Sequence, residues 1–506
     1  MQEKSKAKTV TTKKRKSDNR VIPRYGRRCL GKGVYVSNDT RVTHLNNNDL
    51  IIGSSGSCKT GSIVYTQLKT LQDSSLIVAD SKNMLHRMFR DELEKKGYKV
   101  RVLDFVNPEQ SCMYNPLDYI RKYEDDSYNE MDIMKISRSF IPEQMDGKDP
   151  FWAANARAVL EFFISYTLSA LPAEDHNMYT VARLYRAFSR EMGEAAFIDW
   201  IERHPGTFTA NRYTQIKAMQ VADKTWSGIL AFVNIALYPF DVAILHHIFD
   251  PNGYEDHEDV YGPYFDEDLF DDLDFEDFDC DDADLFADAE EESGDVTSGG
   301  SGADHCAGPM ETSVSNLNED SVEESALPEK EELKIAALGE EKTVLFLNIS
   351  DTDHSMDSLV NLFYTQALQT LVSEADKHEN GQLTVPCRII FDDFAAGTVI
   401  PDFDKEISVI RSRDIWVTLS VQSLSQLESL YSHAQSLTIQ NNCDHIVYMG
   451  SNDLNSAEYI GTRAGKVPEE ILAMDRTREY FIEGGKKAIL IDKVPPYSYS
   501  EGLQAE

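Results

Sequence analysis

The sequence lacks any long apolar run of the kind that crosses a membrane. A membrane-spanning helix needs about 18 or more consecutive apolar residues with few charges. The nearest candidate, residues 226–249, is interrupted by Asn234, Pro239, Asp241 and two histidines. We therefore expect a soluble chain.

Paired cysteines are also absent. Seven cysteines are scattered along the 506 residues, and none stands in a Cys-x-x-Cys pair. Their odd number, together with the lack of a signal peptide, favours a reducing cytoplasm. The spacing argues against a disulfide framework and against a structural zinc site.

Basic residues are scarce in one long segment. The chain has 86 acidic and 50 basic residues, a net charge of −36, but residues 250–340 hold 32 of the acids and only two bases. Residues 266–286 interleave Asp and Glu with Leu and Phe, and residues 294–308 are rich in Ser and Gly. Such a composition buries too little apolar surface to fold alone. We predict a disordered acidic low-complexity insertion over 250–340, acting either as a plain surface loop or as a docking segment for a basic partner.

The opposite charge gathers at the start of the chain. Residues 1–28 contain eleven Lys and Arg against two acids, with almost no apolar pattern. We expect a disordered basic tail over residues 1–28. Such a tail can contact nucleic acid or an anionic membrane surface.

Short apolar strands alternate with helical stretches through most of the remaining chain. This alternation predicts an α/β fold with a largely parallel sheet and helices on both faces. Residues 480–482 and 488–491, on either side of Gly484-Gly485, predict a closing hairpin. The other predicted strands cover residues 50–52, 76–79, 99–103, 343–349, 388–391, 415–419 and 445–449.

Residues 107–223 interrupt this pattern. Their apolar residues recur at a spacing of three to four, as in Val159, Phe162, Phe163 and Tyr166, and no strand is evident. The segment is typical of an all-α domain inserted into the α/β domain.

The clearest chemical signal is a phosphate-binding loop between a strand and a helix. Backbone N–H groups of such a loop and the helix N-terminus surround the phosphates of ATP. Lys59 would reach the β- and γ-phosphates, and Thr60 would bind Mg²⁺. The candidate nucleotide-binding residues are Gly53, Ser54, Ser55, Gly56, Ser57, Cys58, Lys59 and Thr60.

Cys58 departs from the loop pattern, which has Gly immediately before the Lys. If the backbone there takes a positive φ, a β-carbon costs about 1–2 kcal/mol. It also intrudes where the chain approaches the phosphate. Either the change is tolerated with weaker binding, or the site no longer turns over.

Two carboxylates follow the predicted strand 388–391. Asp392 is suited to place Mg²⁺ and Asp393 to polarise an attacking water, although a Glu would reach further than Asp393. Alternatively, two acids simply end a strand. Gln422 follows the next strand and would sense the γ-phosphate, or lie solvated in a loop. Arg411 and Arg413 precede that strand and would act in a neighbouring subunit's site, or lie on the surface.

Many further segments resemble one family, the TraG-type coupling proteins of type IV secretion and conjugation. The resemblance covers residues 47–498 without the acidic insertion. The matching segments are, in chain order, Ala79-Asp80-Ser81-Lys82-Asn83, Gly97-Tyr98-Lys99-Val100, Asn107-Pro108, Tyr114-Asn115-Pro116-Leu117, Phe151-Trp152, Ala222-Asp223-Lys224-Thr225, Asp351-Thr352-Asp353, Tyr364-Thr365-Gln366, Ile400-Pro401-Asp402-Phe403, Ile410-Arg411-Ser412-Arg413, Gln422-Ser423-Leu424-Ser425-Gln426-Leu427, Asn442-Cys443-Asp444 and Gly450-Ser451-Asn452-Asp453.

The resemblance implies a RecA-like P-loop NTPase that uses ATP and Mg²⁺ and assembles as a homo-hexamer. Its all-α domain would meet a relaxase bound to single-stranded DNA, which the motor would pass to the secretion channel at the inner membrane. It also implies catalytic roles for Lys59, Asp392, Asp393 and Gln422, with Arg411 or Arg413 acting across the subunit boundary. The expected domains are a basic tail (1–28), a discontinuous RecA-like domain (29–106, 224–249 and 341–498), an all-α domain (107–223), the acidic insertion (250–340) and a C-terminal tail (499–506).

Departures from the family keep other hypotheses open. The two membrane helices that begin most members are not found, so we expect a cytoplasmic protein held peripherally at the inner face of the membrane. Cys58, Asp393 and the turn at Ser81 and Asn83 differ from the family pattern. The leading hypothesis is an ATP-dependent coupling motor; the alternatives are a catalytically impaired adaptor that recruits substrate, and a cytoplasmic DNA translocase of the FtsK/HerA kind.

Overall fold

The computed structural model describes residues 24–142, 150–189, 194–242, 245–249, 331–350, 352–394 and 399–499. Most of the predicted basic tail and most of the predicted acidic insertion lie outside the described residues. Among the described residues, no helix is both long enough and apolar enough to cross a membrane.

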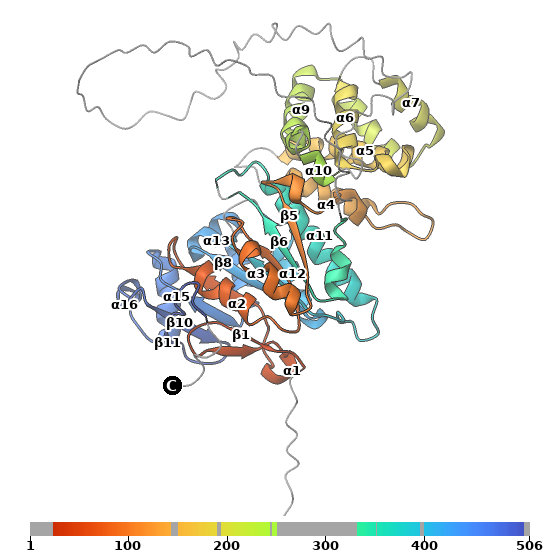
Figure 1. Ribbon diagram of the computed structural model, residues 1–506. Helices are drawn as coiled ribbons and strands as arrows, with labels where there is room; N and C mark the ends of the chain where they lie inside the picture. Colours follow the sequence, from red (N-terminus) through yellow and green to blue (C-terminus); the bar gives the residue numbers. More distant parts are fainter. Residues whose placement is uncertain are drawn as a thin grey trace, which may run out of the picture. The chain divides into compact units, whose positions relative to one another are not determined.

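The centre of the fold is one sheet (Figure 1). From β9 to β5 all neighbouring strands are parallel, while β10 runs antiparallel to both β9 and β11. This confirms the predicted parallel sheet and its closing hairpin. In sheet order the strands are β11 (Ile489–Asp492), β10 (Arg478–Glu483), β9 (His445–Tyr448), β3 (Asp49–Ile52), β8 (Ile415–Val421), β7 (Cys387–Phe391), β4 (Ser75–Ala79), β6 (Thr343–Asn348) and β5 (Lys99–Asp104).

Side-chain alternation along the strands sends apolar residues to both faces of the sheet. On one face, Val78 and Phe346 share a core with Leu68 of helix α2 (Tyr65–Lys69) and Phe89 of α3 (Leu85–Lys95). On the other face, Ile77 and Leu345 belong to a second core with Phe363 and Leu371 of α11 (Asp357–Asp376). The sheet is therefore the middle layer of a three-layer α/β unit.

Shorter elements complete this unit. The hairpin of β1 and β2 packs Leu30 and Val36 against Ile51 of β3. The remaining elements are β1 (Arg27–Cys29), β2 (Tyr35–Ser37), α1 (Thr40–Thr43), the π-helix η1 (Thr60–Val64), η11 (Ile335–Gly339), α12 (Phe403–Val409), η12 (Ile410–Arg413), α13 (Leu424–Leu430), α14 (His433–Asn441), α15 (Leu454–Ala464) and α16 (Pro468–Leu472).

The described residues between β5 and β6 are helical wherever they form a regular element. Helix α5 lies at its centre, with Phe162 and Phe163 fully buried, and contacts α4, α6, α8 and α9. The elements are η2 (Pro108–Gln110), η3 (Pro116–Tyr119), α4 (Glu130–Phe140), α5 (Pro150–Ala170), η4 (Ala173–Asp175), α6 (Met178–Ser189), α7 (Glu194–Arg203), α8 (Phe208–Met219), α9 (Asp223–Leu237), η5 (Tyr238–Asp241) and α10 (His246–Phe249).

Three predicted segment boundaries differ from the structure. Residues 224–249 were expected in the nucleotide-binding domain, but α9 packs on α5, and Gly228 leaves room for the Trp152 ring. Residues 331–340, expected in the acidic insertion, are folded because Ile335 and Leu338 are buried. Residues 24–28, expected in the basic tail, are folded as well because the sheet buries Arg28.

The strand order places the candidate site. Parallel strands bring their carboxyl ends to one edge of the sheet, where open α/β folds bind ligands. Strand β8 separates β3, which leads into the phosphate loop, from β7, which ends at the two acids. We call this edge the carboxyl edge and the opposite one the amino edge.

Candidate nucleotide-binding site

The phosphate loop connects β3 to η1 and is fixed to the neighbouring strands. The Gly53 N–H donates to the carbonyl of Val421 at 3.0 Å, and the Ser54 N–H donates to the carbonyl of Gly450 at 2.9 Å. Gly56 has a φ of 76°. The loop thus has the strand–loop–helix geometry that its sequence predicts.

Cys58 adopts the conformation that a glycine would favour. Its φ is 70°, in the left-handed region, so the expected positive φ is found. The Cys58 carbonyl accepts the Ser62 N–H at 2.8 Å and so begins the helix. The backbone therefore keeps the loop shape at a conformational cost of about 1–2 kcal/mol.

The structure brings Lys59, Thr60 and the two acids together. The Lys59 ammonium is buried, donates to the carbonyl of Gly53 at 2.8 Å, and lies 3.4 Å from Asp393 Oδ1. The Thr60 hydroxyl donates to Asp392 Oδ2 at 2.5 Å. Residues from two distant segments of the sequence, the phosphate loop and the end of β7, thus meet at the carboxyl edge.

The donor set at this point fits a hard divalent cation. Asp392 Oδ1 is buried and has no hydrogen-bond partner among the described residues. Burial raises the pKa of Asp392 above its ordinary value, and the neighbouring Asp393 adds to the shift. A hydroxyl and a carboxylate oxygen are ligands that Mg²⁺ prefers. Thr60 and Asp392 are therefore the residues that could hold Mg²⁺.

Asp393 and Gln422 line a cavity beside this pair. The cavity has a volume of about 380 Å³ and extends along the carboxyl edge past Asp392. Asp393 is half exposed and has a φ of 51°, which is strained for a residue with a side chain. Gln422, at the end of β8, thus lines the same cavity as the two acids, and its contact with a γ-phosphate stays a prediction.

Arg411 and Arg413 lie at the amino edge, away from the phosphate loop of the same chain. They belong to η12, which precedes β8, and a strand of this length spans about 20 Å. Arg411 donates to the carbonyl of His44 at 3.1 Å. Arg413 binds both carboxylate oxygens of Asp376 at 2.9 and 3.0 Å. Their action in a neighbouring subunit stays a prediction.

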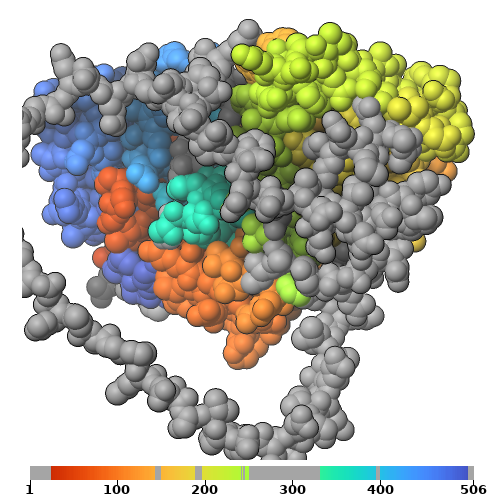
Figure 2. All heavy atoms as spheres, turned by 90° about the horizontal axis from the view of Figure 1, so that it is seen from above, coloured from red at the N-terminus to blue at the C-terminus, as the bar shows by residue number. Residues whose placement is uncertain are grey.

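Two contacts at the loop were not foreseen. Lys493 Nζ, from the residue after β11, donates to the carbonyls of Ser57 at 3.3 Å and Met449 at 2.8 Å. The N–H of Tyr497 donates to the carbonyl of Gly61 at 3.0 Å. Figure 2 shows the dark blue C-terminal residues beside red and orange residues of the first quarter of the chain. No sequence signal indicated which surface the residues after β11 would cover.

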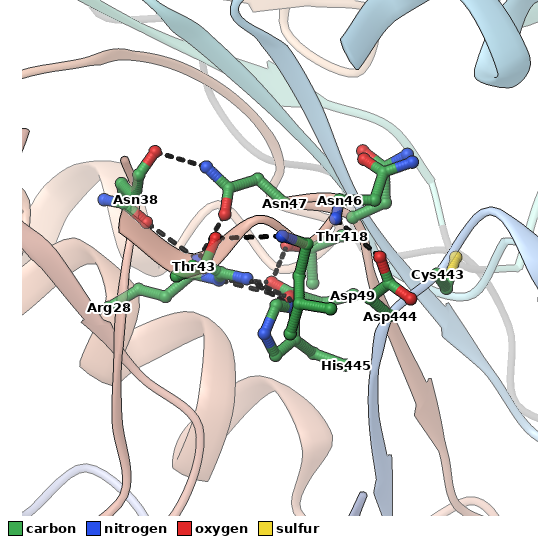
Figure 3. A network of polar contacts seen from close by, with 12 residues as sticks. Arg28, Asn38, Thr43, Asn46, Asn47, Asp49, Thr418, Cys443, Asp444 and His445 are labelled. Atoms are coloured by element: carbon green, nitrogen blue, oxygen red, sulfur yellow. Dashed lines mark hydrogen bonds and ion pairs between the residues drawn. The ribbon is translucent and has the colours of Figure 1, made fainter. Parts of the chain in front are cut away.

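A buried polar network at the amino edge was also missed (Figure 3). Asp49, the first residue of β3, is fully buried. Its carboxylate accepts hydrogen bonds from both Nε and Nη2 of Arg28, at 2.7 to 3.1 Å. Arg388 Nη1 and the Thr418 hydroxyl each donate to Asp49 Oδ2 at 3.0 Å. His445 Nδ1 lies 3.0 Å from Arg28 Nη2. We call Arg28, Asp49, Arg388, Thr418 and His445 the Asp49 network.

The ionisable groups of the Asp49 network shift one another's pKa. Burial alone would raise the pKa of Asp49, but Arg28 and Arg388 hold it below its ordinary value. Burial and the charge of Arg28 lower the pKa of His445 to about 4, so this ring is neutral. The network therefore fixes the start of β3, while the other end of that strand carries the phosphate loop.

Two family models match this chain. Residues 2–246 match the family model for type IV secretory system conjugative DNA transfer. Residues 386–480 match the model for the TraM recognition site of TraD and TraG. A search of curated proteins gave no match.

Solved structures share the fold. The bacterial conjugative coupling protein TrwBΔN70, in a trigonal form with sulphate, has a TM-score of 0.55 at 11% identity, over 92% of this chain and 88% of that chain. TrwB with ADP and Mg²⁺ has a TM-score of 0.53 at 11% identity, over 88% and 85% of the two chains. TrwB with the ATP analogue ADPNP has a TM-score of 0.55 at 11% identity, over 92% and 88%.

The two family models match most of the chain, and their residues include the phosphate loop, both acids and Gln422. The solved coupling proteins share the observed fold. The chain belongs to the TraG-type conjugative coupling proteins of type IV secretion systems.

Proposed function

We propose that this chain is the ATP-dependent motor that recruits a relaxase–DNA complex and passes it to the transfer channel of a conjugative element. The observation that carries the proposal is the contact of Thr60 with Asp392 at 2.5 Å, beside Lys59, in a coupling-protein fold. This is the arrangement in which a P-loop NTPase holds Mg²⁺ and the terminal phosphates.

Each residue has a separate role in this proposal. The backbone of residues 53–60 cradles the phosphates, and Lys59 neutralises the β- and γ-phosphates. Thr60 and Asp392 hold Mg²⁺, which when bound neutralises the charge that develops on the phosphates. Asp393 accepts a proton from the attacking water, and Gln422 contacts the γ-phosphate from β8.

The arginines complete the site only in an assembly. Arg411 and Arg413 lie at the amino edge, so a role in phosphate chemistry requires a neighbouring subunit. We propose a homo-hexamer in which one of them reaches that neighbour's phosphates. Arg411 is the better candidate, because Arg413 is held by Asp376 within its own chain.

Partners follow from the family. Region 386–480 corresponds to the TraM recognition site and is a docking region for relaxosome proteins in this proposal. The helical segment between β5 and β6 meets the relaxase and single-stranded DNA. The basic tail holds the chain at the inner face of the membrane near the channel, and the acidic insertion binds a basic partner.

A second function, a substrate-recruiting adaptor with impaired turnover, is favoured by two strained positions. Cys58 and Asp393 both have positive φ, at a loop residue and at the residue that would activate water. Asp393 is also 3.4 Å from Lys59, so the ion pair competes with the roles of both groups. The hypothesis of an FtsK/HerA-type translocase is dropped, because the chain belongs to the conjugative coupling proteins.

The test is ATP binding and hydrolysis by the purified full chain with Mg²⁺, with and without single-stranded DNA. Cys58→Gly and Lys59→Ala are measured beside it. The motor proposal predicts that the natural chain binds and hydrolyses ATP, and that Lys59→Ala does neither. Turnover only in Cys58→Gly would favour the adaptor instead, and no ATP binding by any of the chains would contradict the motor.

A further inference from the structure

The residues after β11 form a strap across the beginning of the phosphate-loop helix. We define the strap as Lys493, Val494, Pro495, Pro496, Tyr497, Ser498 and Tyr499. Lys493 Nζ binds the carbonyls of Ser57 and Met449. At the other end of the strap, Tyr499 packs against the core that contains Tyr65. The strap is therefore fixed on both sides of the loop.

Its middle residue lies directly on the first helical turn. Gly61 follows Thr60, and a β-carbon at Gly61 would come within 3.0 Å of Pro496 and 3.1 Å of the Tyr497 ring. The Tyr497 N–H donates to the Gly61 carbonyl at 3.0 Å. The ring meets that of Tyr65 edge-on at 5.6 Å. Glycine at position 61 thus lets an aromatic ring approach the backbone next to the Mg²⁺ ligand.

These contacts leave part of the Tyr497 side chain exposed. It is 42% exposed, although three contacts hold its backbone and ring. Its φ is 56°, a strained value for an aromatic residue and one that tends to occur where structure serves function. Burial and the nearby Asp392, Cys58 and Asp80 raise the pKa of Tyr497.

A nucleotide bound in this loop can have only one orientation relative to the sheet. Its γ-phosphate must lie near Asp393 and Gln422, which come from β7 and β8 on one side of β3. The α-phosphate and nucleoside must leave the loop elsewhere, past the first helical turn. The strap reaches that turn from β11, on the opposite side of β3.

We infer that the strap forms a wall of the nucleotide pocket and that the Tyr497 ring packs against the base or ribose of the nucleotide. This inference rests on the proposed binding of ATP. Aromatic side chains bind bases by stacking, and the exposed part of the ring is free for this purpose. Lys493 is a positioning residue that holds the loop and the strap together.

The experiment compares ligands with and without a base, by calorimetric titration of the full chain with Mg²⁺. The ligands are ATP, ADP and inorganic tripolyphosphate; the variants are Tyr497→Ala, Tyr497→Phe and, as a control, Tyr238→Ala. Tyr238 is 56% exposed and belongs to η5, in the helical segment between β5 and β6. Tyr497→Ala should weaken ATP and ADP about 10-fold and leave tripolyphosphate within roughly 2-fold. Tyr497→Phe and Tyr238→Ala should bind all three ligands as the natural chain does.

Each other outcome overturns the inference. Equal losses of ATP and tripolyphosphate in Tyr497→Ala would show that the strap only supports the loop. A gain in ATP affinity would show that Tyr497 covers the site, and a loss in Tyr497→Phe would assign the contact to the hydroxyl. If the natural chain binds tripolyphosphate and ATP equally well, the base has no contact. If it binds neither, the proposed function fails and the inference fails with it.

Discussion

Two buried carboxylates, one at each edge of the same sheet, differ in their hydrogen bonding and in the direction of their pKa shifts. Asp49 at the amino edge accepts hydrogen bonds from Arg28, Arg388 and Thr418, and its pKa is lowered. Glu479 at the carboxyl edge is equally buried, but neither of its oxygens has a hydrogen-bond partner among the described residues. Burial raises the pKa of Glu479 to about 8.

The same contrast extends to the surrounding residues. The amino edge contains paired charges around the start of β3. The carboxyl edge contains an unpartnered Asp392 oxygen and positive φ values at Cys58 and Asp393. Unsatisfied and strained groups tend to collect where a ligand completes the structure. The amino edge also has buried atoms without a partner among the described residues, Arg388 Nη2 and His445 Nε2, and a positive φ at Asp414. The comparison therefore rests on the two carboxylates: Asp49 is held by arginines where β3 begins, whereas Glu479 and one oxygen of Asp392 are left without a partner in the described part of the chain at the end where the phosphate loop lies.

The largest expected effect is that of Asp49→Ala. It would leave two buried guanidinium groups without their carboxylate and lower the free energy of unfolding by about 3–5 kcal/mol. Chemical denaturation followed by circular dichroism measures this. Asp49→Asn keeps an acceptor for Thr418 and should lose less. A loss below about 1 kcal/mol, the range of surface ion pairs, would mean that the network does not hold the amino edge.

Replacing Glu479 should change how stability depends on pH. Because the folded state raises its pKa to about 8, the folded chain binds this proton more tightly than the unfolded chain. Stability is then present at low pH and is lost as pH rises toward 8, by at most about 1.4 kcal/mol per pH unit. Glu479→Gln should remove this loss, as measured by thermal unfolding at a series of pH values. Parallel pH profiles for both proteins would contradict the description of Glu479 as an unpaired acid.

A smaller effect is expected from Cys58→Gly. Glycine tolerates the φ of 70°, so the variant should gain about 1–2 kcal/mol in the free energy of unfolding. Cys58→Ala is the matched control, because it removes the thiol but keeps the β-carbon. Equal gains in both variants would assign the effect to the thiol and not to the backbone.

The smallest effect is a pH dependence of Mg²⁺-dependent ATP binding. Since burial raises the pKa of Asp392, protonation should weaken binding at a pH above the ordinary aspartate value of about 3.9. Titration calorimetry at decreasing pH measures the midpoint. Asp392→Asn should bind weakly at every pH tested, and a midpoint unchanged by this substitution would assign the titration to another group.

Much of the fold was predictable because its signals are local. Apolar runs bounded by turn residues predicted the seven parallel strands and the hairpin of β10 and β11. The phosphate loop and Asp392 were predictable from residue types next to strand ends. The positive φ of Cys58 followed from the place of glycine in the loop pattern.

What escaped prediction depends on contacts between distant residues. Arg28 and His445, 417 positions apart, meet only because β1 packs on the sheet beside β9. Tyr497 and Gly61 are likewise joined by tertiary structure. The misplaced boundary at residues 224–249 has the same origin, because an apolar helix does not reveal whether it packs on a sheet or on other helices.

The most direct test of the division between the two edges is thermal unfolding of the natural chain and of Lys59→Ala, with and without Mg²⁺ and ATP. Each chain is compared with itself without nucleotide, because Lys59→Ala also removes the buried contacts of Lys59 with Gly53 and Asp393. With ATP at one hundred times its dissociation constant, the natural chain should gain about 2.7 kcal/mol, whereas Lys59→Ala should gain nothing. An equal gain in both chains, or no gain in the natural chain at saturating ATP, would contradict the assignment of the carboxyl edge as the nucleotide site.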